Sequence, residues 1–215
     1  MERLLWLYSL PVDARFPVIC FDERPCFLIG DTVAALLMKE SSPRKEHYEY
    51  EKNGSCALLA AIEPKTGNRL AQVYDQRTKR EYALFLKELA AQYPQAVKIR
   101  LVQDNLNTHN LSSFYETFPA EEAFALAQRF EFYYTPKKAS WLNMIEIEFS
   151  ALARQCLNRR IASKAELERE IAAIVKERVA KAIKIEWQFS IESARTKLNR
   201  HYEQVHAANI KYRET

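Results

Sequence analysis

Glycine is scarce in this sequence: 3 of its 215 residues are glycine, whereas 8 are proline. Gly30, Gly54 and Gly67 stand too far apart for a Walker loop or a GxGxxG dinucleotide fingerprint, both of which need closely spaced glycines. Whatever this protein does to phosphates, it therefore does without a glycine-rich cradle.

The sequence also lacks any run of roughly 18 apolar residues, the length that a membrane span requires. Its first 15 residues contain an acid and an early proline, which argues against a signal peptide. The 4 cysteines form no CxxC pair, and none stands near a histidine at zinc-ligand spacing. These absences favour buried, reduced thiols in a cytosolic protein.

The composition is that of an ordinary globular protein, with 48% hydrophobic and 28% charged residues. The length suits one substantial domain with a small appendage. The net charge of +4 is unevenly spread, because residues 137–215 hold 16 basic and 10 acidic side chains. A basic C-terminal third suits a polyanionic partner, although solvated basic helices give the same pattern.

The pattern of apolar residues predicts an α/β protein with a mixed sheet flanked by helices. A strand at 17–21 is expected to stop at a polar turn, with a loop over 24–46 whose clearest irregular part is 41–45. Asn53-Gly54 predicts a hairpin turn between strands at 47–51 and 55–62.

Further along, a capping box at 78–81 opens a helix that ends before Pro94. Residue 142 begins a largely helical region with a second capping box at 163–166. The other expected elements are strands at 69–74, 97–103 and 130–135 and helices at 111–118, 120–128 and 188–204.

Three acidic positions stand out by their place in these elements. Asp22 follows the first strand and Asp104 follows the strand at 97–103, so their carboxylates would converge if those strands are neighbours. The third candidate lies in WLNMIEIE at 141–148, at the start of a helix. Carboxylates with little histidine or thiolate favour Mg²⁺ or Mn²⁺, and two such ions about 4 Å apart support phosphodiester displacement.

Each acid also has a purely structural interpretation. Strand-end aspartates often hydrogen-bond the backbone in Asx-turns. Glu146 stands three residues after Asn143, which suits a capping box. Helical spacing does not separate Glu146 from Glu148, because the two flank the predicted core stripe on opposite sides.

Three blocks carry a resemblance: CFDERP at 20–25, VQDNLNTH at 102–109 and YTPKKASWLNMIEIEFS at 134–150. In this order they resemble the catalytic blocks of bacterial insertion-sequence transposases related to Tc/mariner, which are DDE enzymes on an RNase H-like fold. The similarity extends over essentially the whole chain, including RQCLNRR at 154–160. It implies a mixed five-stranded sheet flanked by helices, with a C-terminal helical extension.

The resemblance implies that Asp22, Asp104 and Glu146 are the catalytic triad and hold two Mg²⁺ (or Mn²⁺) ions. Glu146, rather than Glu148, matches the glutamate after Asn-Pro-Ile in the wider superfamily, with Met144 in place of the proline. The implied activity is DNA cleavage at insertion-sequence ends, followed by transfer of the freed 3′-hydroxyl to target DNA at a TA site.

Further side chains are expected around the triad. Asn105 and His109 are accessory candidates, His109 to position a phosphate or water or, alternatively, to cap the next helix. Glu23 is expected on the opposite face of the strand from Asp22 and is left outside the site. The side chains expected to contact DNA, each of which also suits an ordinary surface position, are Lys137, Lys138, Trp141, Arg154, Arg159 and Arg160.

The expected division is a linker remnant at 1–16, an RNase H-like DDE catalytic domain at 17–160 and a C-terminal helical extension at 161–215 packed on the same domain. Full-length relatives carry an N-terminal helix-turn-helix region that recognises the terminal inverted repeats, and residues 1–16 do not supply one. A split gene with a separately encoded helix-turn-helix polypeptide and a degraded copy are the two explanations.

The resemblance implies three partners: DNA at the element ends and target, a second copy in a homodimer, and that helix-turn-helix polypeptide. The implied location is the cytoplasm, on the nucleoid when DNA is bound. Two alternatives stay open. One is a non-catalytic fragment that inhibits a full-length relative by dimerisation or DNA binding, and the other is a different RNase H-like nuclease.

Overall fold

The computed structural model describes residues 1–34, 39–40 and 47–212. One five-stranded sheet has the order β3-β2-β1-β4-β5, in which β1 pairs antiparallel with β2 and parallel with β4. The strands are β1 (Val18–Asp31), β2 (Tyr50–Ile62), β3 (Arg69–Tyr74), β4 (Ile99–Gln103) and β5 (Phe130–Tyr134). The predicted mixed sheet is confirmed.

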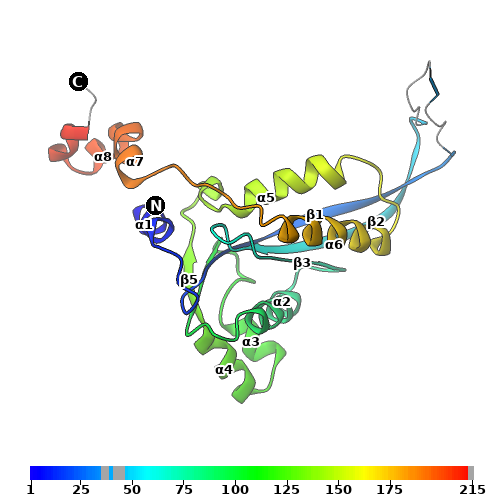
Figure 1. Cartoon of the computed structure of the whole chain (residues 1–215), viewed down its shortest axis with the longest axis horizontal. Coiled ribbons are helices and arrows are strands. Elements are labelled where there is room, and N and C mark those ends of the chain that lie inside the picture. Colours follow the sequence, from blue (N-terminus) through cyan, green and yellow to red (C-terminus); the bar gives the residue numbers. More distant parts are fainter. Residues whose placement is uncertain (35–38, 41–46, 213–215) are drawn as a thin grey trace.

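Helices cover both faces of the sheet (Figure 1). On one face lie α2 (Lys79–Gln92), α3 (Ser112–Thr117) and α4 (Ala120–Arg129). On the other lie α5 (Ile145–Leu152), which continues into a π-helical turn at Ala153–Leu157, and α6 (Lys164–Ala180). The remaining elements are α1 (Glu2–Ser9), α7 (Ile191–Lys197), α8 (Asn199–Val205) and 3₁₀ turns at Ser140–Leu142 and Ala207–Tyr212.

Alternation along β1 divides its side chains between two hydrophobic cores. Ile19 and Phe21 belong to the core beneath α2, whereas Cys20 belongs to the core beneath α5 and α6. Continuing this alternation, Asp22 faces the α5 side and Glu23 the α2 side. The face predicted for Glu23 is therefore correct.

The strongest local signals give the elements that they predict. Thr78 and Glu81 form a complete capping box at the start of α2, and Tyr82, Phe85 and Leu86 are buried beneath it. The predicted helices at 111–118 and 120–128 agree with α3 and α4 to within one residue at each end. Local capping and hydrophobic spacing were therefore sufficient to predict these three helices.

The prediction that the first strand stops at 21 is wrong, because β1 runs through Asp22 and Pro25 to Asp31. Pairing with β4 ends at Cys20–Val102, but pairing with β2 continues, so this part of β1 is an edge on its β4 side. A proline is tolerated on such an edge, where no N–H is needed for the missing neighbour. Residues 24–31 of the predicted 24–46 loop therefore belong to β1. The irregular part predicted at 41–45 lies outside the described residues.

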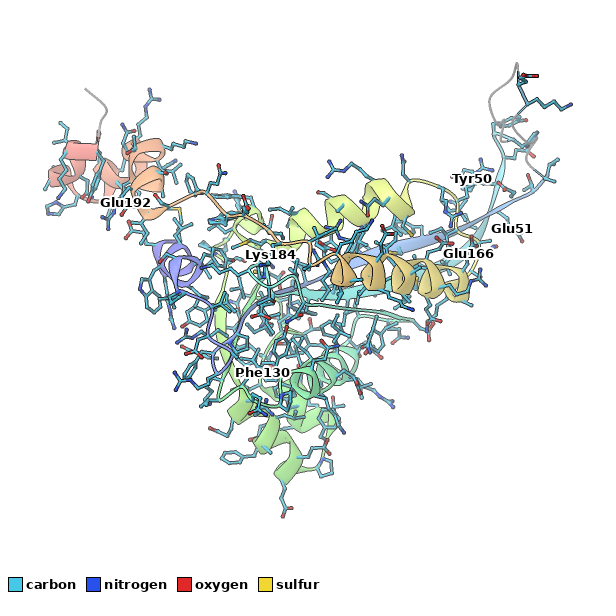
Figure 2. All side chains as sticks on the ribbon, in the orientation of Figure 1. Tyr50, Glu51, Phe130, Glu166, Lys184 and Glu192 are labelled. Atoms are coloured by element: carbon cyan, nitrogen blue, oxygen red, sulfur yellow. The ribbon has the colours of Figure 1, made fainter. Side chains whose placement is uncertain are left out.

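Asn53-Gly54 does not form the predicted turn, because β2 runs without a break from Tyr50 to Ile62. Gly54 has a φ of 104° and lies where the β1–β2 register shifts, so the glycine serves a bulge. The two strands thus form a two-stranded arm that extends beyond the sheet. Tyr50 and Glu51 lie on this arm (Figure 2), which contacts the segment between α5 and α6 through Arg160 over the Tyr50 ring and through Asn53, which donates to the carbonyl of Ala162.

The C-terminal region is less continuous than predicted. The expected helix at 188–204 is two helices, α7 and α8, which are separated at Leu198. Ser163 caps α6 by accepting a hydrogen bond from the backbone of Glu166. The carboxylate of Glu166 reaches the N–H of Ala162 rather than that of Ser163, so the second predicted capping box is only half formed.

Residues 2–9 form helix α1, which packs its apolar side chains into the core beneath α5. Glu2 binds Arg195 and accepts a hydrogen bond from Tyr202, so α1 is tied to α7 and α8 (Figure 1). Among the described residues, no helix combines the length and the apolarity needed to cross a membrane.

Candidate active site

Asp22 and Asp104 lie side by side because their strands are parallel neighbours. The last β1–β4 pair is Cys20–Val102, and each aspartate stands two residues beyond its member of that pair. Asp22 accepts a hydrogen bond from the N–H of Glu23 at 2.8 Å, and Asp104 Oδ1 accepts one from the N–H of Leu106 at 3.3 Å. The Asx-turn contact expected of a strand-end aspartate is thus present at Asp104, together with its proximity to Asp22.

The start of α5 is fixed against β1 by side chains from outside the helix. The buried amide of Asn143 donates to the carbonyl of Phe21 at 2.8 Å, directly beside Asp22. The hydroxyl of Tyr8 donates to the carbonyl of Leu142 at 2.7 Å. No side chain caps α5, so Asn143 does not form the capping box considered for Glu146. Its amide instead sets how close Glu146 lies to Asp22.

Replacing Asn143 with alanine is expected to lower the free energy of unfolding by about 1–3 kcal/mol, because the carbonyl of Phe21 loses its buried donor. Urea unfolding followed by circular dichroism measures this change. Asn158→Ala, at an exposed position, is the matched control and should change stability by no more than about 0.5 kcal/mol. Equal stabilities of the two variants would contradict the role of Asn143.

Electrostatics connect the three acids. Burial, followed by the negative charges of Glu23, Asp104 and Glu146, raises the pKa of Asp22 to about 7. Among the described residues, no three His, Cys, Asp or Glu side chains converge as closely as a formed metal site requires. The donors nevertheless suit a hard divalent cation, because they are carboxylate oxygens and the negative charges of its neighbours help to raise the pKa of Asp22.

Glu146 and Glu148 have different surroundings, which spacing alone did not separate. Glu146 is exposed near Asp22 and Asp104, whereas Glu148 is 3% exposed and bound to two arginines. Arg69 donates to Glu148 at 2.9 Å, and Arg178 donates to both of its oxygens at 2.9 and 3.0 Å. Glu148 is therefore a structural ion-pair partner, and Glu146 is left to face the aspartates.

His109 contacts Asp104 directly. Its Nδ1 lies 2.5 Å from Asp104 Oδ1, and its Nε2 lies 2.9 Å from Glu23 Oε2. Burial by itself lowers the pKa of His109, but the contacts with Asp104 and Glu23 outweigh it and raise the pKa to about 9. No side chain caps α3, so the capping alternative for His109 does not hold. The sequence prediction left Glu23 outside the site, because strand alternation shows which face a side chain occupies but not that it reaches Asp104 through His109.

The other predicted site residues lie on the surface around the triad. Asn105, Lys137, Lys138 and Arg154 are exposed. Trp141 is about half exposed and packs against Phe189 at a ring-centroid distance of 5.5 Å. All of these side chains are accessible to a ligand: Lys137, Lys138 and Trp141 precede α5, whereas Arg154 follows its C-terminal end.

Arg159 and Arg160 differ from them, because both form ion pairs within the chain. Arg159 lies 2.8 Å from Glu170, and Arg160 lies 2.7 Å from Asp31. Arg160 also donates to backbone carbonyls at His47 and Glu49, just before β2 begins, so it binds the outer end of the two-stranded arm. These contacts give each arginine a structural role whether or not it also contacts DNA.

Arg24 is a further cation that sequence analysis did not single out. It stands two residues beyond Asp22 on β1, so both side chains face the α5 side of the sheet. Its guanidinium lies 3.4 Å from the carbonyl of Phe149 on α5. This places a positive charge between β1 and α5.

Comparisons with known proteins agree with this geometry. A family model described as DDE superfamily endonuclease matches residues 17–168. Among solved structures, the Mos1 mariner paired end complex with Mn matches with a TM-score of 0.57 at 14% identity, over 99% of this chain and 61% of that chain. A pre-cleavage Mos1 transpososome matches with a TM-score of 0.56 at 12% identity and the same coverage. No curated protein matches the sequence.

The chain spans about three fifths of the length of the Mos1 chains, and at these identities the likeness concerns the fold. The expected RNase H-like architecture, a mixed five-stranded sheet flanked by helices, is confirmed. The family model covers more than half of the chain and includes Asp22, Asp104 and Glu146. This chain therefore belongs to the family of DDE superfamily endonucleases.

Proposed function

We propose that this chain is the catalytic domain of a transposase that cleaves DNA at insertion-sequence ends and joins the freed 3′-hydroxyl to target DNA. The observation that carries the proposal is the placement of the three acids: Asp22 and Asp104 each stand two residues beyond the last β1–β4 pair, and Asn143 holds the start of α5, with Glu146, to the β1 backbone beside Asp22. Three acids from separate elements next to one another are costly unless a cation binds between them.

The chain's own residues would hold two Mg²⁺ or Mn²⁺ ions through the carboxylates of Asp22, Asp104 and Glu146. Bound ions of this kind lower the pKa of an attacking water or hydroxyl and stabilise the leaving oxygen. The role of the protein is then to hold the carboxylates in place and to align the DNA strand. Asn143 supports this alignment, because it fixes α5 to β1 beside Asp22.

The proposed DNA path follows the cations around the triad. Arg24 and Arg154 lie on the α5 side, and Lys137 and Lys138 lie in the loop before α5. All four suit contacts with phosphates, which position a duplex without reading its sequence. Trp141, half exposed beside them, suits stacking on an unpaired base.

The Mos1 structures are paired-end and pre-cleavage complexes, so two copies of this chain on two DNA ends belong to the same proposal. Target joining at a TA site and a helix-turn-helix polypeptide that recognises the ends belong to it as well. Binding of element ends by such a polypeptide would leave the chemistry to the present chain.

The proposal is tested with supercoiled plasmid that carries the DNA flanking the gene for this chain. The protein is expected to nick this plasmid and join the 3′-hydroxyl ends to a second plasmid when Mg²⁺ or Mn²⁺ is present. Excess EDTA should abolish both products, because the carboxylates alone supply no activated nucleophile. Gel analysis of nicked and joined products measures the outcome.

Two variants serve as references in this assay. Asp104→Ala removes a proposed ligand and should be inactive, whereas Asp75→Asn, at an 81% exposed side chain after β3, should act like the unaltered protein. Equal nicking by the unaltered protein and Asp104→Ala would show that the nuclease activity comes from another site or a contaminant. A protein that nicks but never joins ends would favour a nuclease over a transposase.

A further inference from the structure

The imidazole of His109 is buried between carboxylates from two different parts of the sheet. Its Nδ1 faces Asp104 just beyond β4, and its Nε2 faces Glu23 on β1. His109 is 2% exposed, and the side chain of Glu23 is 6% exposed. A continuous chain of polar contacts therefore runs from the interior of the α2 side to a proposed metal ligand.

Neighbouring side chains hold the imidazole ring in one orientation. Tyr82 stacks on it at 4.8 Å between ring centroids, and Phe21 meets it edge-on at 5.4 Å. The amide of Gln103 donates to the carbonyl of His109 at 3.0 Å and accepts from the hydroxyl of Tyr82 at 2.7 Å. Both the ring and the backbone of His109 are thus fixed to the core.

The two carboxylate oxygens of Asp104 have different contacts. Oδ1 receives His109 and the N–H of Leu106, whereas no hydrogen bond or ion pair from the described part of the chain reaches Oδ2. Since the carboxylate is about one third exposed and follows the end of a strand, little else restrains its rotation. The contact at Oδ1 leaves Oδ2 directed away from His109 and free for a ligand.

Glu23 completes this arrangement from the opposite side of the ring. Its Oε2 faces Nε2 of His109, and its Oε1 lies 3.8 Å from the mostly exposed guanidinium of Arg77. A carboxylate at this position favours an N–H on Nε2 and orients the ring, as carboxylates do behind many functional histidines. Two adjacent residues of β1 would then contribute to the site. Asp22 would do so directly, as a proposed metal ligand, and Glu23 indirectly, through the contact of His109 with Asp104.

We propose that Glu23 is a positioning residue that acts through His109 to hold Asp104 with Oδ2 available to the metal ion. This inference rests on the proposed function, because it takes Asp104 as a metal ligand. Glu23 itself touches neither the metal ion nor the DNA. Its effect should therefore appear in metal affinity and in the state of His109 rather than in DNA binding.

The test is Glu23→Gln, which keeps the shape of the side chain and removes its charge. Two quantities are measured: the affinity for Mn²⁺, by electron paramagnetic resonance of the free ion, and the ¹⁵N and ¹H signals of the His109 ring in metal-free protein. We expect Mn²⁺ affinity to fall by about 10–100-fold, the usual effect of removing a group that orients a metal ligand. The His109 ring signals should change as well.

Glu63→Gln is the matched control. Glu63 is also 6% exposed and also holds several polar partners, but these are Thr66, Asn68 and Tyr93 in a turn away from His109. Its loss should lower stability while leaving Mn²⁺ affinity within about twofold. A merely structural Glu23 would behave in the same way as Glu63.

Three outcomes separate the hypotheses. Lower Mn²⁺ affinity and altered His109 signals in Glu23→Gln alone support the inference. If Asp104→Ala loses Mn²⁺ affinity but Glu23→Gln keeps both its affinity and its His109 signals, the inference fails and the proposed function stands. If the unaltered protein, with and without DNA, binds no more Mn²⁺ than Asp104→Ala, both fail.

Discussion

Replacing Glu148 with alanine is expected to lower the free energy of unfolding by about 3–5 kcal/mol, because two largely buried arginines lose their common carboxylate. The side chain of Arg69 is 1% exposed and that of Arg178 is 11% exposed. Taking one partner from such a group leaves uncompensated charge in the interior, which costs much more than breaking an ion pair on the surface.

The position of these three residues increases the effect. Arg69 begins β3, Glu148 lies in α5 and Arg178 lies near the end of α6, so the cluster joins three elements. Arg69 also donates to the carbonyls of Gly67 and Ile183. Loss of Glu148 should therefore loosen the attachment of α6 to the sheet in addition to the local charge effect.

Guanidinium chloride unfolding, followed by tryptophan fluorescence, measures the change. Glu146→Ala is the control, since it removes the same side chain two residues earlier at an exposed position. It should alter stability by no more than about 0.5 kcal/mol. Similar losses in the two variants would mean that the Glu148 ion pairs do not stabilise the fold.

Replacing Glu146 with glutamine is expected to reduce Mg²⁺-dependent DNA nicking by at least about 100-fold. Changes in groups that merely orient metal ligands cost 10–100-fold, and loss of a ligand itself should cost no less. Stability should be nearly unchanged because the side chain is exposed. Nicking rates under single-turnover conditions, with unfolding curves of the same preparations, give both quantities.

A second measurement on Glu146→Gln needs no metal ion. The negative charge of Glu146 contributes to the raised pKa of Asp22, although burial is the larger cause. Removing that charge should lower the pKa of Asp22 while leaving it above the usual range. Carboxyl ¹³C titration of metal-free protein would detect the shift, and an unchanged Asp22 would show that the two acids are not close neighbours.

Together these predictions assign opposite roles to two glutamates on one helix. Glu146→Gln should remove activity without loss of stability. Glu148→Ala should act mainly on stability, because Glu148 is not a proposed metal ligand. Spacing along the helix could not distinguish them, because it reports only which side of the core stripe each occupies. The resemblance to known transposases selected Glu146, and the arginines around Glu148 give the physical reason.

Some of the fold followed from local sequence. The capping box at Thr78 and the spacing of Tyr82, Phe85 and Leu86 predict α2, since these signals act within one or two helical turns. The alternating strand that ends at Gln103 is equally local. Such elements were found because the interactions that define them lie close together in the chain.

Other parts depended on partners far away in the sequence. β1 continues through Pro25 because β2 pairs with it on one side while β4 has already ended on the other. Asn53-Gly54 carries a typical turn signal, yet the pairing of the long strands turns it into a bulge. Local propensity gave the wrong answer at both places because strand pairing outweighs it.

The candidate site shows the same division. The sequence by itself determined the residues of the proposed chemistry, because its three blocks supply Asp22, Asp104 and Glu146 and its scarcity of glycine excludes a glycine-rich phosphate loop. Only the tertiary structure decided how the acids are held, through Asn143 on the carbonyl of Phe21 and through His109 between Asp104 and Glu23. Residue types can be read along a chain, whereas the contacts of Asn143 with Phe21 and of His109 with Glu23 join residues far apart in the sequence and exist only after the chain has folded.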